Sequence, residues 1–231
     1  MKYANIVSGT FILRRNRFIA EVEVNGKTEV VHVKNTGRCK ELLLPDIEVF
    51  LEKSDNPARK TLYDLIAVRK KRPGKMPLLI NMDSQIPNAA ALEWLKNSDM
   101  FSADAVFRRE VTHNNSRFDI FIEDAGRKVF VEVKGVTLEQ DGIAMFPDAP
   151  TERGVKHLTE LSECVRQGFE AYVFFVIQMK EISCFKPHDA MHPEFGNALR
   201  NAAQSGVKIL AMDSIVTPDS IRVDAPVNIQ L

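Results

Sequence analysis

Two runs of alternating residues, joined by a tight-turn signal, constrain the fold of this chain most strongly. The apolar residues fall on every second position, as in half-buried β-strands. They are Phe118, Ile120 and Ile122 in the first run and Val129, Val131 and Val133 in the second. Between the runs lies Asp124-Ala125-Gly126-Arg127, a sequence typical of a tight hairpin turn. A hairpin about Ala125-Gly126 pairs Ile120 with Val131 and gathers the apolar side chains on one face, so the hydrophobic pattern selects this register.

The same register brings acidic residues together. It places Asp119 opposite Glu132, and a preceding turn at Asn114-Asn115 places Glu110 opposite Asp119. Like charges directly opposite one another destabilise a sheet, so this row needs a compensating cation. Oxygen ligands suit Mg²⁺ or Mn²⁺. We therefore predict metal ligands at Glu110, Asp119 and Glu132; the alternative is a row of solvated charges on an exposed sheet face.

Two basic residues adjoin the acidic row. Lys134 follows Glu132 by two positions, on the same face, and the register places Arg117 opposite Lys134. An anion such as a phosphate relieves the repulsion between the two cations. Asp119, Glu132 and Lys134 are thus the candidate catalytic residues of a metal-dependent phosphodiesterase, with Lys134 acting on the attacking water or the phosphate. The alternative is two flexible side chains that reach solvent.

Length and composition bound the rest. The 231 residues suffice for one large or two small domains, and a hydrophobic content of 45% supports a real core. We expect no membrane span and no signal sequence. The three cysteines are odd in number and lack metal-site spacing, which favours reduced thiols in a cytoplasmic protein.

The charge is unevenly spread along the chain. Residues 1–83 carry 16 Lys and Arg against 10 Asp and Glu, and residues 84–231 carry 15 against 21. The basic part is a candidate surface for nucleic acid, with DNA as the expected partner and Arg38 as a candidate contact.

Residues 1–83 are predicted to form a small closed barrel of the OB type. The expected strands are 10–14, 18–24, 28–33, 47–52, 62–70 and 78–82, with a short helix over Arg38–Leu44 after the Asn35-Thr36-Gly37 cap and turn. Barrels of this type often bind single strands on exposed aromatics. Phe11, Phe18 and Tyr63 are candidates, although a place in the core is favoured for all three.

Residues 84–231 are predicted to form an α/β domain with a mixed sheet. The expected helices are 89–96, capped by Asn88, then 151–167 and 193–204; the expected strands are 106–112, 116–123, 128–136, 172–177 and 207–212. The start of the second helix carries Thr151, Arg153, Lys156 and His157. A helix N-terminus with added cations favours phosphate. Ordinary surface polarity is the alternative, and His157 is also a candidate for a buried, hydrogen-bonded histidine.

Several motifs together resemble one family, the bacterial sugar fermentation stimulation protein A family. They are Asn35-Thr36-Gly37-Arg38, Tyr63-Asp64-Leu65-Ile66-Ala67-Val68, Asn115-Ser116-Arg117-Phe118-Asp119, Val131-Glu132-Val133-Lys134-Gly135 and Phe146-Pro147-Asp148-Ala149-Pro150-Thr151-Glu152-Arg153-Gly154. The resemblance implies an OB-like N-terminal domain and a C-terminal domain of the PD-(D/E)xK nuclease fold. It also implies DNA binding with little sequence preference and a regulatory link to sugar use.

Three functions remain open from the sequence. The leading hypothesis is a DNA-binding protein of low sequence specificity with a nuclease-type metal site. The second is an active Mg²⁺-dependent nuclease acting on DNA or RNA, and the third is a ligand-sensing or scaffold protein.

Overall fold

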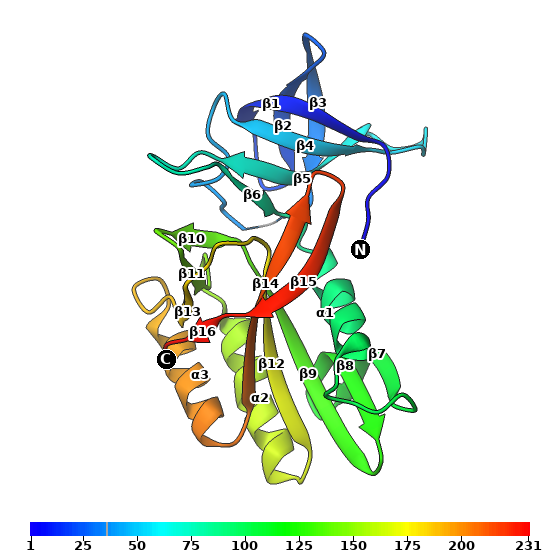
Figure 1. The fold of residues 1–231 in the computed structure, drawn as a ribbon, viewed down its shortest axis with the longest axis vertical. Helices are drawn as coiled ribbons and strands as arrows, with labels where there is room; N and C mark the ends of the chain where they lie inside the picture. The colour runs from blue at the N-terminus through cyan, green and yellow to red at the C-terminus, as the bar shows by residue number, and fades with distance from the viewer. Residues whose placement is uncertain (36) are drawn as a thin grey trace.

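The N-terminal part of the chain forms a closed five-stranded barrel at one end of the molecule (Figure 1). The computed structural model describes residues 1–35 and 37–231. The barrel strands are β1 (Ile6–Arg14), β2 (Ile19–Val24), β3 (Lys27–Val33), β4 (Glu48–Lys53) and β5 (Tyr63–Lys70). A parallel pairing of Val31 with Tyr63 joins β3 to β5 and closes the barrel, and β6 (Leu78–Asn81) extends it from β5. The predicted OB-like fold is confirmed.

The helix predicted over Arg38–Leu44 is wrong. The backbone there makes a single turn, in which the Leu43 amide donates to the Cys39 carbonyl at 3.0 Å. Cys39 has a left-handed φ of 44°, which a right-handed helix does not tolerate. Pro45, which directly follows Leu44, prevents the turn from continuing as a helix. Thr36, part of the predicted cap, lies outside the described residues.

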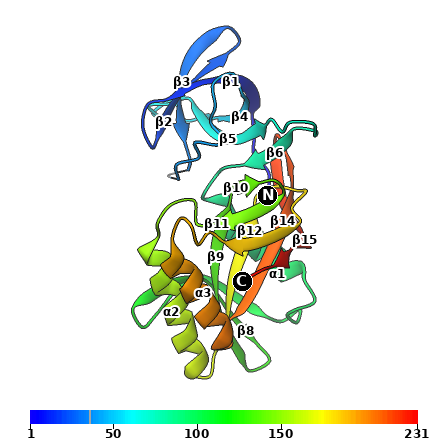
Figure 2. The same ribbon diagram turned by 90° about the vertical axis from the view of Figure 1, so that its left-hand side faces the viewer.

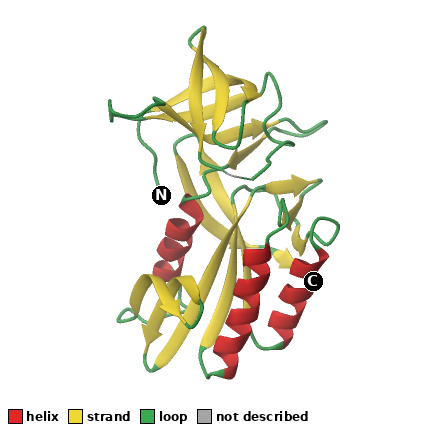
Figure 3. Ribbon diagram, turned by 180° about the vertical axis from the view of Figure 1, so that it is seen from behind, coloured by secondary structure: helices red, strands yellow, loops and turns green. Residues whose placement is uncertain are grey.

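The second part is a six-stranded mixed sheet covered on both faces. The strand order is β15-β14-β12-β9-β8-β7. The strands are β7 (Val106–His113), β8 (Ser116–Asp124), β9 (Arg127–Val136), β12 (Glu170–Ile177), β14 (Lys208–Thr217) and β15 (Ser220–Pro226). Helix α1 (Ile86–Asn97) packs on one face, and helices α2 (Glu152–Arg166) and α3 (Pro193–Gln204) lie on the other (Figures 2 and 3). The predicted mixed-sheet α/β domain is confirmed.

A small second sheet, not expected from the sequence, lies beside the α/β domain. Its strands, in spatial order, are β10 (Leu138–Gln140), β11 (Ile143–Phe146), β13 (Cys184–Pro187) and β16 (Asn228–Ile229). Strands of two to four residues are too short to display a period of two. The partners of β11 and β13 are also far apart in the chain, so no local signal announces them.

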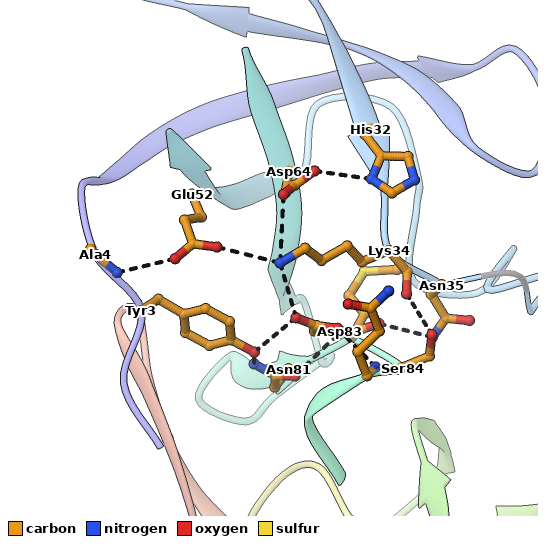
Figure 4. Close-up of polar contacts among 12 residues, drawn as sticks. Tyr3, Ala4, His32, Lys34, Asn35, Glu52, Asp64, Asn81, Asp83 and Ser84 are labelled. Atoms are coloured by element: carbon orange, nitrogen blue, oxygen red, sulfur yellow. Dashed lines mark hydrogen bonds and ion pairs between the residues drawn. The ribbon is translucent and has the colours of Figure 1, made fainter. Parts of the chain in front are cut away.

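A partly buried polar cluster lies where the barrel meets the α/β domain (Figure 4). Lys34 lies at its centre, with Nζ 3.4 Å from Glu52, 3.5 Å from Asp64 and 3.4 Å from Asp83. The Tyr3 hydroxyl adjoins Asp83, and the main chain of Tyr3 bonds Asp219 ahead of β15. We call Lys34, Glu52, Asp64 and Asp83 the Lys34 cluster. The first residues of the chain thus contact the α/β domain as well as the barrel.

The connection between the two parts is short. Strand β6 ends at Asn81 and helix α1 begins at Ile86, so the predicted boundary between residues 83 and 84 falls inside this connection and stays a prediction. In residues 1–35 and 37–231, none of the helices has the length and apolar character needed to cross a membrane.

Candidate functional site

The central hairpin has the register that the hydrophobic pattern selects. Ile120 pairs with Val131, and the turn residues Ala125 and Gly126 have positive φ values of 47° and 84°. In the preceding hairpin, Val111 pairs with Phe118 about a turn in which Asn114 has a φ of 50°. Local turn chemistry and alternation therefore predict both registers correctly.

Asp119 lacks a ladder partner on both sides: the β7–β8 ladder skips it and the β8–β9 ladder stops before it. The candidate site lies where this pairing is interrupted. The β8–β9 ladder ends at the Ile120–Val131 pair, so the predicted pairing of Asp119 with Glu132 is wrong and Asp119 lies just beyond the ladder. Its Oδ2 accepts from the Val133 amide at 2.8 Å, and its Oδ1 accepts from Asn88 Nδ2 at 2.7 Å. The carboxylate therefore occupies the place of a ladder bond between the separating strands.

Asn88 is a residue of the site, a role that the sequence does not predict for it. It was predicted as the cap of α1, but the helix begins at Ile86, with Pro87 in its first turn, where proline is favoured. A side chain at position 135 would meet Pro87 Cγ at 2.7 Å and Gln178 Oε1 at 2.6 Å. Gly135 thus lets the start of α1 approach β9, which brings Asn88 to Asp119.

Glu110 does not join the acidic row, contrary to the prediction. Its φ of 54° interrupts the β7–β8 ladder at the step where it would face Asp119. Its exposed carboxylate lies 3.6 Å from Arg117 Nη1. The prediction that Phe118 shares one apolar face with Ile120 is also wrong. Phe118 packs with Phe130 on the α2 face, whereas Ile120 packs on the α1 face, because the strand is irregular between them.

The predicted pairing of Arg117 with Lys134 is also not found. The ladder between their strands ends before reaching them, and β9 continues alone beside β12, with Lys134 opposite Phe175. Arg117 is instead an exposed partner of Glu110. The reason is the same interruption at Asp119, because a strand that leaves its neighbour no longer sets cross-strand pairs.

Glu132 lies at the centre of the site and is only 3% exposed. Its Oε1 contacts Lys134 Nζ at 2.5 Å and also His157 Nδ1. Arg153 Nε donates to His157 Nε2 at 3.3 Å, so that Nε2 is an acceptor and Nδ1 carries the proton donated to Glu132. Glu132 Oε2, in contrast, is buried with no hydrogen-bond partner in the part of the chain that the structure describes.

The two carboxylates differ in their electrostatics. Burial, with a smaller contribution from the charge of Glu132, raises the pKa of Asp119. Burial also opposes ionisation of Glu132, but the hydrogen bonds from His157 and Lys134 together outweigh it and hold the pKa of Glu132 below its usual value. Glu132 is therefore anionic near neutral pH, and an added cation would favour the ionised form of Asp119.

The donor set fits a divalent cation with few protein ligands. Across residues 1–35 and 37–231, no three His, Cys, Asp or Glu side chains gather closely enough to hold an ion. Mg²⁺ commonly binds through one or two carboxylates and keeps several waters or substrate oxygens. Asp119 with the free Glu132 Oε2 matches that pattern, so the residues present fit such an ion without Glu110.

The residues predicted to contact DNA fall into different places. His157 is 4% exposed and donates to Glu132, so the alternative of a buried, hydrogen-bonded histidine is confirmed, and its contact with DNA stays a prediction. Thr151 caps α2 by accepting from the Gly154 amide at 3.1 Å. Arg153 and Lys156 lie exposed on the first turns of α2, and Lys156 donates to the Asn115 carbonyl.

Arg38 lies on the barrel side of a cleft of about 760 Å³ between the two parts of the molecule. The opposite wall is formed by residues 146–151, which lead into α2. The cleft thus runs from the basic barrel to the helix whose His157 holds Glu132.

Comparisons with known proteins agree over the whole chain. The family model "Sugar fermentation stimulation protein RE domain" matches residues 85–220, and "SfsA N-terminal OB domain" matches residues 12–78. A sugar fermentation stimulation protein homolog of Desulfitobacterium hafniense strain Y51 is 56% identical over 231 residues, covering 100% of this chain and 99% of that protein. A homolog of Clostridium beijerinckii is 53% identical over 223 residues, covering 96% of each chain.

A solved structure is similar as well. Pyrococcus furiosus SfsA in complex with Ca²⁺ superposes with a TM-score of 0.84 at 26% sequence identity, covering 100% of this chain and 98% of that chain.

Proposed function

This chain belongs to the sugar fermentation stimulation protein family, and on that premise we propose that it is a cytoplasmic nucleic-acid-binding protein with a metal-dependent nuclease site. One observation carries the proposal. Within the described residues 1–35 and 37–231, Glu132 Oε2 is buried without a hydrogen-bond partner, near Asp119 and Lys134. Burying a carboxylate oxygen in this way is costly unless a ligand compensates it. The Ca²⁺ complex of the Pyrococcus relative supports a divalent cation as that ligand.

Each residue of the site has a distinct task under this proposal. Asp119 and Glu132 bind Mg²⁺ or Mn²⁺, which polarises a phosphoryl oxygen and activates water when bound. His157 fixes the orientation of Glu132 through Oε1 and leaves Oε2 free. Asn88 and the Val133 amide orient Asp119. Lys134, 15% exposed in its side chain, presents a positive charge beside the scissile phosphate.

The basic barrel supports binding of nucleic acid with little sequence preference. Contacts from Lys and Arg to phosphates position a strand but carry no sequence information. Affinity is therefore expected to fall steeply with salt and to vary little with sequence. The family's link to sugar use then acts through the nucleic acid that is bound or cut.

The test is a cleavage assay on single- and double-stranded DNA and RNA with Mg²⁺ or Mn²⁺. We expect Asp119→Ala and Lys134→Ala to lower the rate by about 10²–10³-fold, the loss typical for removing one group that stabilises transition-state charge. Lys128→Ala removes an exposed lysine from the opposite end of β9 and serves as the control. Cleavage that is unchanged in the two site variants, or absent for every wild-type substrate, would contradict the nuclease assignment.

A further inference from the structure

One arginine of the barrel holds two loops at the mouth of the cleft between the barrel and α2. All five N–H donors of the Arg14 guanidinium are used, and every acceptor is a main-chain carbonyl. The acceptors are Asn16, Arg17, Asn35, Gly37 and Arg38, at 2.6–3.1 Å. Arg14 therefore sets the position of the loop after β1 and of Asn35, Gly37 and Arg38 after β3, and its own donors are unavailable to a ligand.

The residues that these loops carry are free to bind. Arg17, Arg38 and Lys40 line the cleft and are exposed, and none of them has an acidic partner within ion-pair distance among residues 1–35 and 37–231. One acidic side chain, Asp148, belongs to the opposite wall and packs against Gly37. The barrel side of the cleft is thus a cationic surface whose backbone is held by Arg14, and such a surface attracts a phosphate backbone.

An exposed aromatic residue adjoins this surface. Of the three aromatics considered for stacking, Phe11 is 2% and Tyr63 is 8% exposed, so both belong to the core. The core position favoured for Phe18 is wrong, because its side chain is 50% exposed; it directly follows Arg17. Its amide donates to Asn16 Oδ1 at 2.9 Å and its carbonyl accepts from the Val33 amide at 2.7 Å, so its backbone is held in place. An exposed phenylalanine on a fixed loop next to arginines is the arrangement on which unpaired bases stack.

We propose that this surface binds single-stranded nucleic acid, with a base stacked on Phe18 and the backbone along Arg17, Arg38 and Lys40. The inference rests on the proposed function and names its preferred substrate. A base within a duplex is already stacked and does not offer its face, whereas an unpaired base does. The cleft volume of about 760 Å³ lies within the range of small-ligand sites, about 300–1,000 Å³, which suits a few nucleotides of one strand.

The direction of the cleft links this surface to the acidic site. Its far wall, residues 146–151, leads to Thr151 at the N-terminus of α2, where the helix dipole favours phosphate. A strand that follows the cleft is carried from the barrel toward Glu132 and Lys134. Arg14 is a positioning residue in this arrangement, because it acts only through the loops that it holds.

Binding is measured by fluorescence anisotropy with a labelled oligothymidylate, a matched single-stranded RNA and a duplex, in EDTA so that no cleavage occurs. We expect Phe18→Ala to weaken binding of both single strands by about tenfold, within the range for losing one stacked base, and to leave the duplex unchanged. Met76→Ala, which truncates an apolar side chain that is 77% exposed elsewhere on the barrel, is the control. Equal losses for single strand and duplex, or no loss for either, would overturn the proposal.

The contribution of the cationic residues is measured by the salt dependence of binding. Arg17→Ala and Arg38→Ala should each reduce the salt dependence of single-strand binding by about 0.7 in the log–log slope, the value for one phosphate contact. Lys27→Ala removes an exposed cation at the β2–β3 turn, at the other end of β2 from this loop, and should leave the slope unchanged. A slope that responds equally to all three variants would show diffuse attraction rather than a site.

The role of Arg14 is tested by Arg14→Lys, which keeps the charge but lacks the five-donor fork. We expect weaker single-strand binding in this variant and a smaller further loss on adding Arg38→Ala than in the wild-type background. Fully additive losses would refute positioning by Arg14. Because every measurement here is of binding without metal, a failed nuclease assay leaves these outcomes interpretable.

Discussion

The molecule contains two clusters in which a lysine meets buried carboxylates, and they differ in one respect. In the Lys34 cluster, each carboxylate oxygen has at least one donor. Asp64, for example, receives Arg59 and His32 as well as Lys34, and Asp83 receives the Gln85 amide at 2.9 Å. In the cluster around Lys134, both donors converge on Glu132 Oε1 and Oε2 is left without one.

The difference separates a structural cluster from a binding site. The residue types are the same and the burial is similar, with side-chain exposures of 17% for Lys34 and 15% for Lys134. A cluster whose acceptors are all satisfied has nothing to offer a ligand, whereas an unsatisfied buried oxygen does. Composition alone would not distinguish them, because each presents acidic residues near a lysine.

The largest expected effect concerns the Lys34 cluster. Lys34→Met removes the cation shared by Asp64, Asp83 and Glu52. Asp64 keeps Arg59, but among residues 1–35 and 37–231 the buried Asp83 then has no cationic partner. We expect a loss of about 3–5 kcal/mol in the free energy of unfolding, measured by urea denaturation without divalent metal. Lys134→Met is the matched comparison and should lose clearly less, because Glu132 keeps His157. Equal losses would remove the distinction between the two clusters.

The second effect concerns the cluster around Lys134, in which Glu132 Oε2 lacks a donor among the described residues. At a Mn²⁺ concentration of about 100 times its Kd, binding to the native state alone adds about 2.7 kcal/mol to the stability. We expect this increase in the wild type, measured by denaturation with and without Mn²⁺. Glu132→Gln should abolish the stabilisation by Mn²⁺, whereas Asp83→Asn, in the Lys34 cluster, should retain it. A Glu132→Gln protein that still responds to Mn²⁺ would place the cation elsewhere.

The smallest expected effect concerns Glu170, whose ion pairs lie at the surface and serve as a reference for the two clusters. Glu170 lies between Arg127 at 2.7 Å and Lys208 at 2.9 Å, and these partners, Arg127 first, lower its pKa to about 2. The pKa in the folded state is depressed, so the stabilisation is present above the unfolded value of about 4.3 and is lost as the pH falls toward 2. Glu170→Gln should cost about 1 kcal/mol at neutral pH.

The control for this prediction is the pH dependence itself. The difference in unfolding free energy between wild type and Glu170→Gln should shrink steadily from pH 5 downward. A difference that stays constant over this range would mean that the glutamate acts through packing rather than charge.

Much of the site follows from local sequence. The registers of both hairpins come from alternation with period two and from turn residues that tolerate positive φ, such as Asn114 and Gly126. Both signals act over a few residues, and a one-residue slip would turn every side chain to the wrong face. The two registers are the basis for predicting Asp119, Glu132 and Lys134 as one site, although the ladder itself stops before the Asp119–Glu132 pair.

The remaining features depended on contacts between distant segments. Asn88 enters the site because Gly135 lets α1 approach β9. Glu110 is a different case, because a local left-handed φ, which the alternating pattern does not reveal, keeps it out of the acidic row. His157 became the partner of Glu132, and Phe18 alone of three candidate aromatics stayed exposed. Burial and hydrogen-bond partners are set by what packs against a residue, and for these residues the packing comes from segments far away in the chain. Only the tertiary structure could therefore decide which carboxylate oxygen remains open to a ligand.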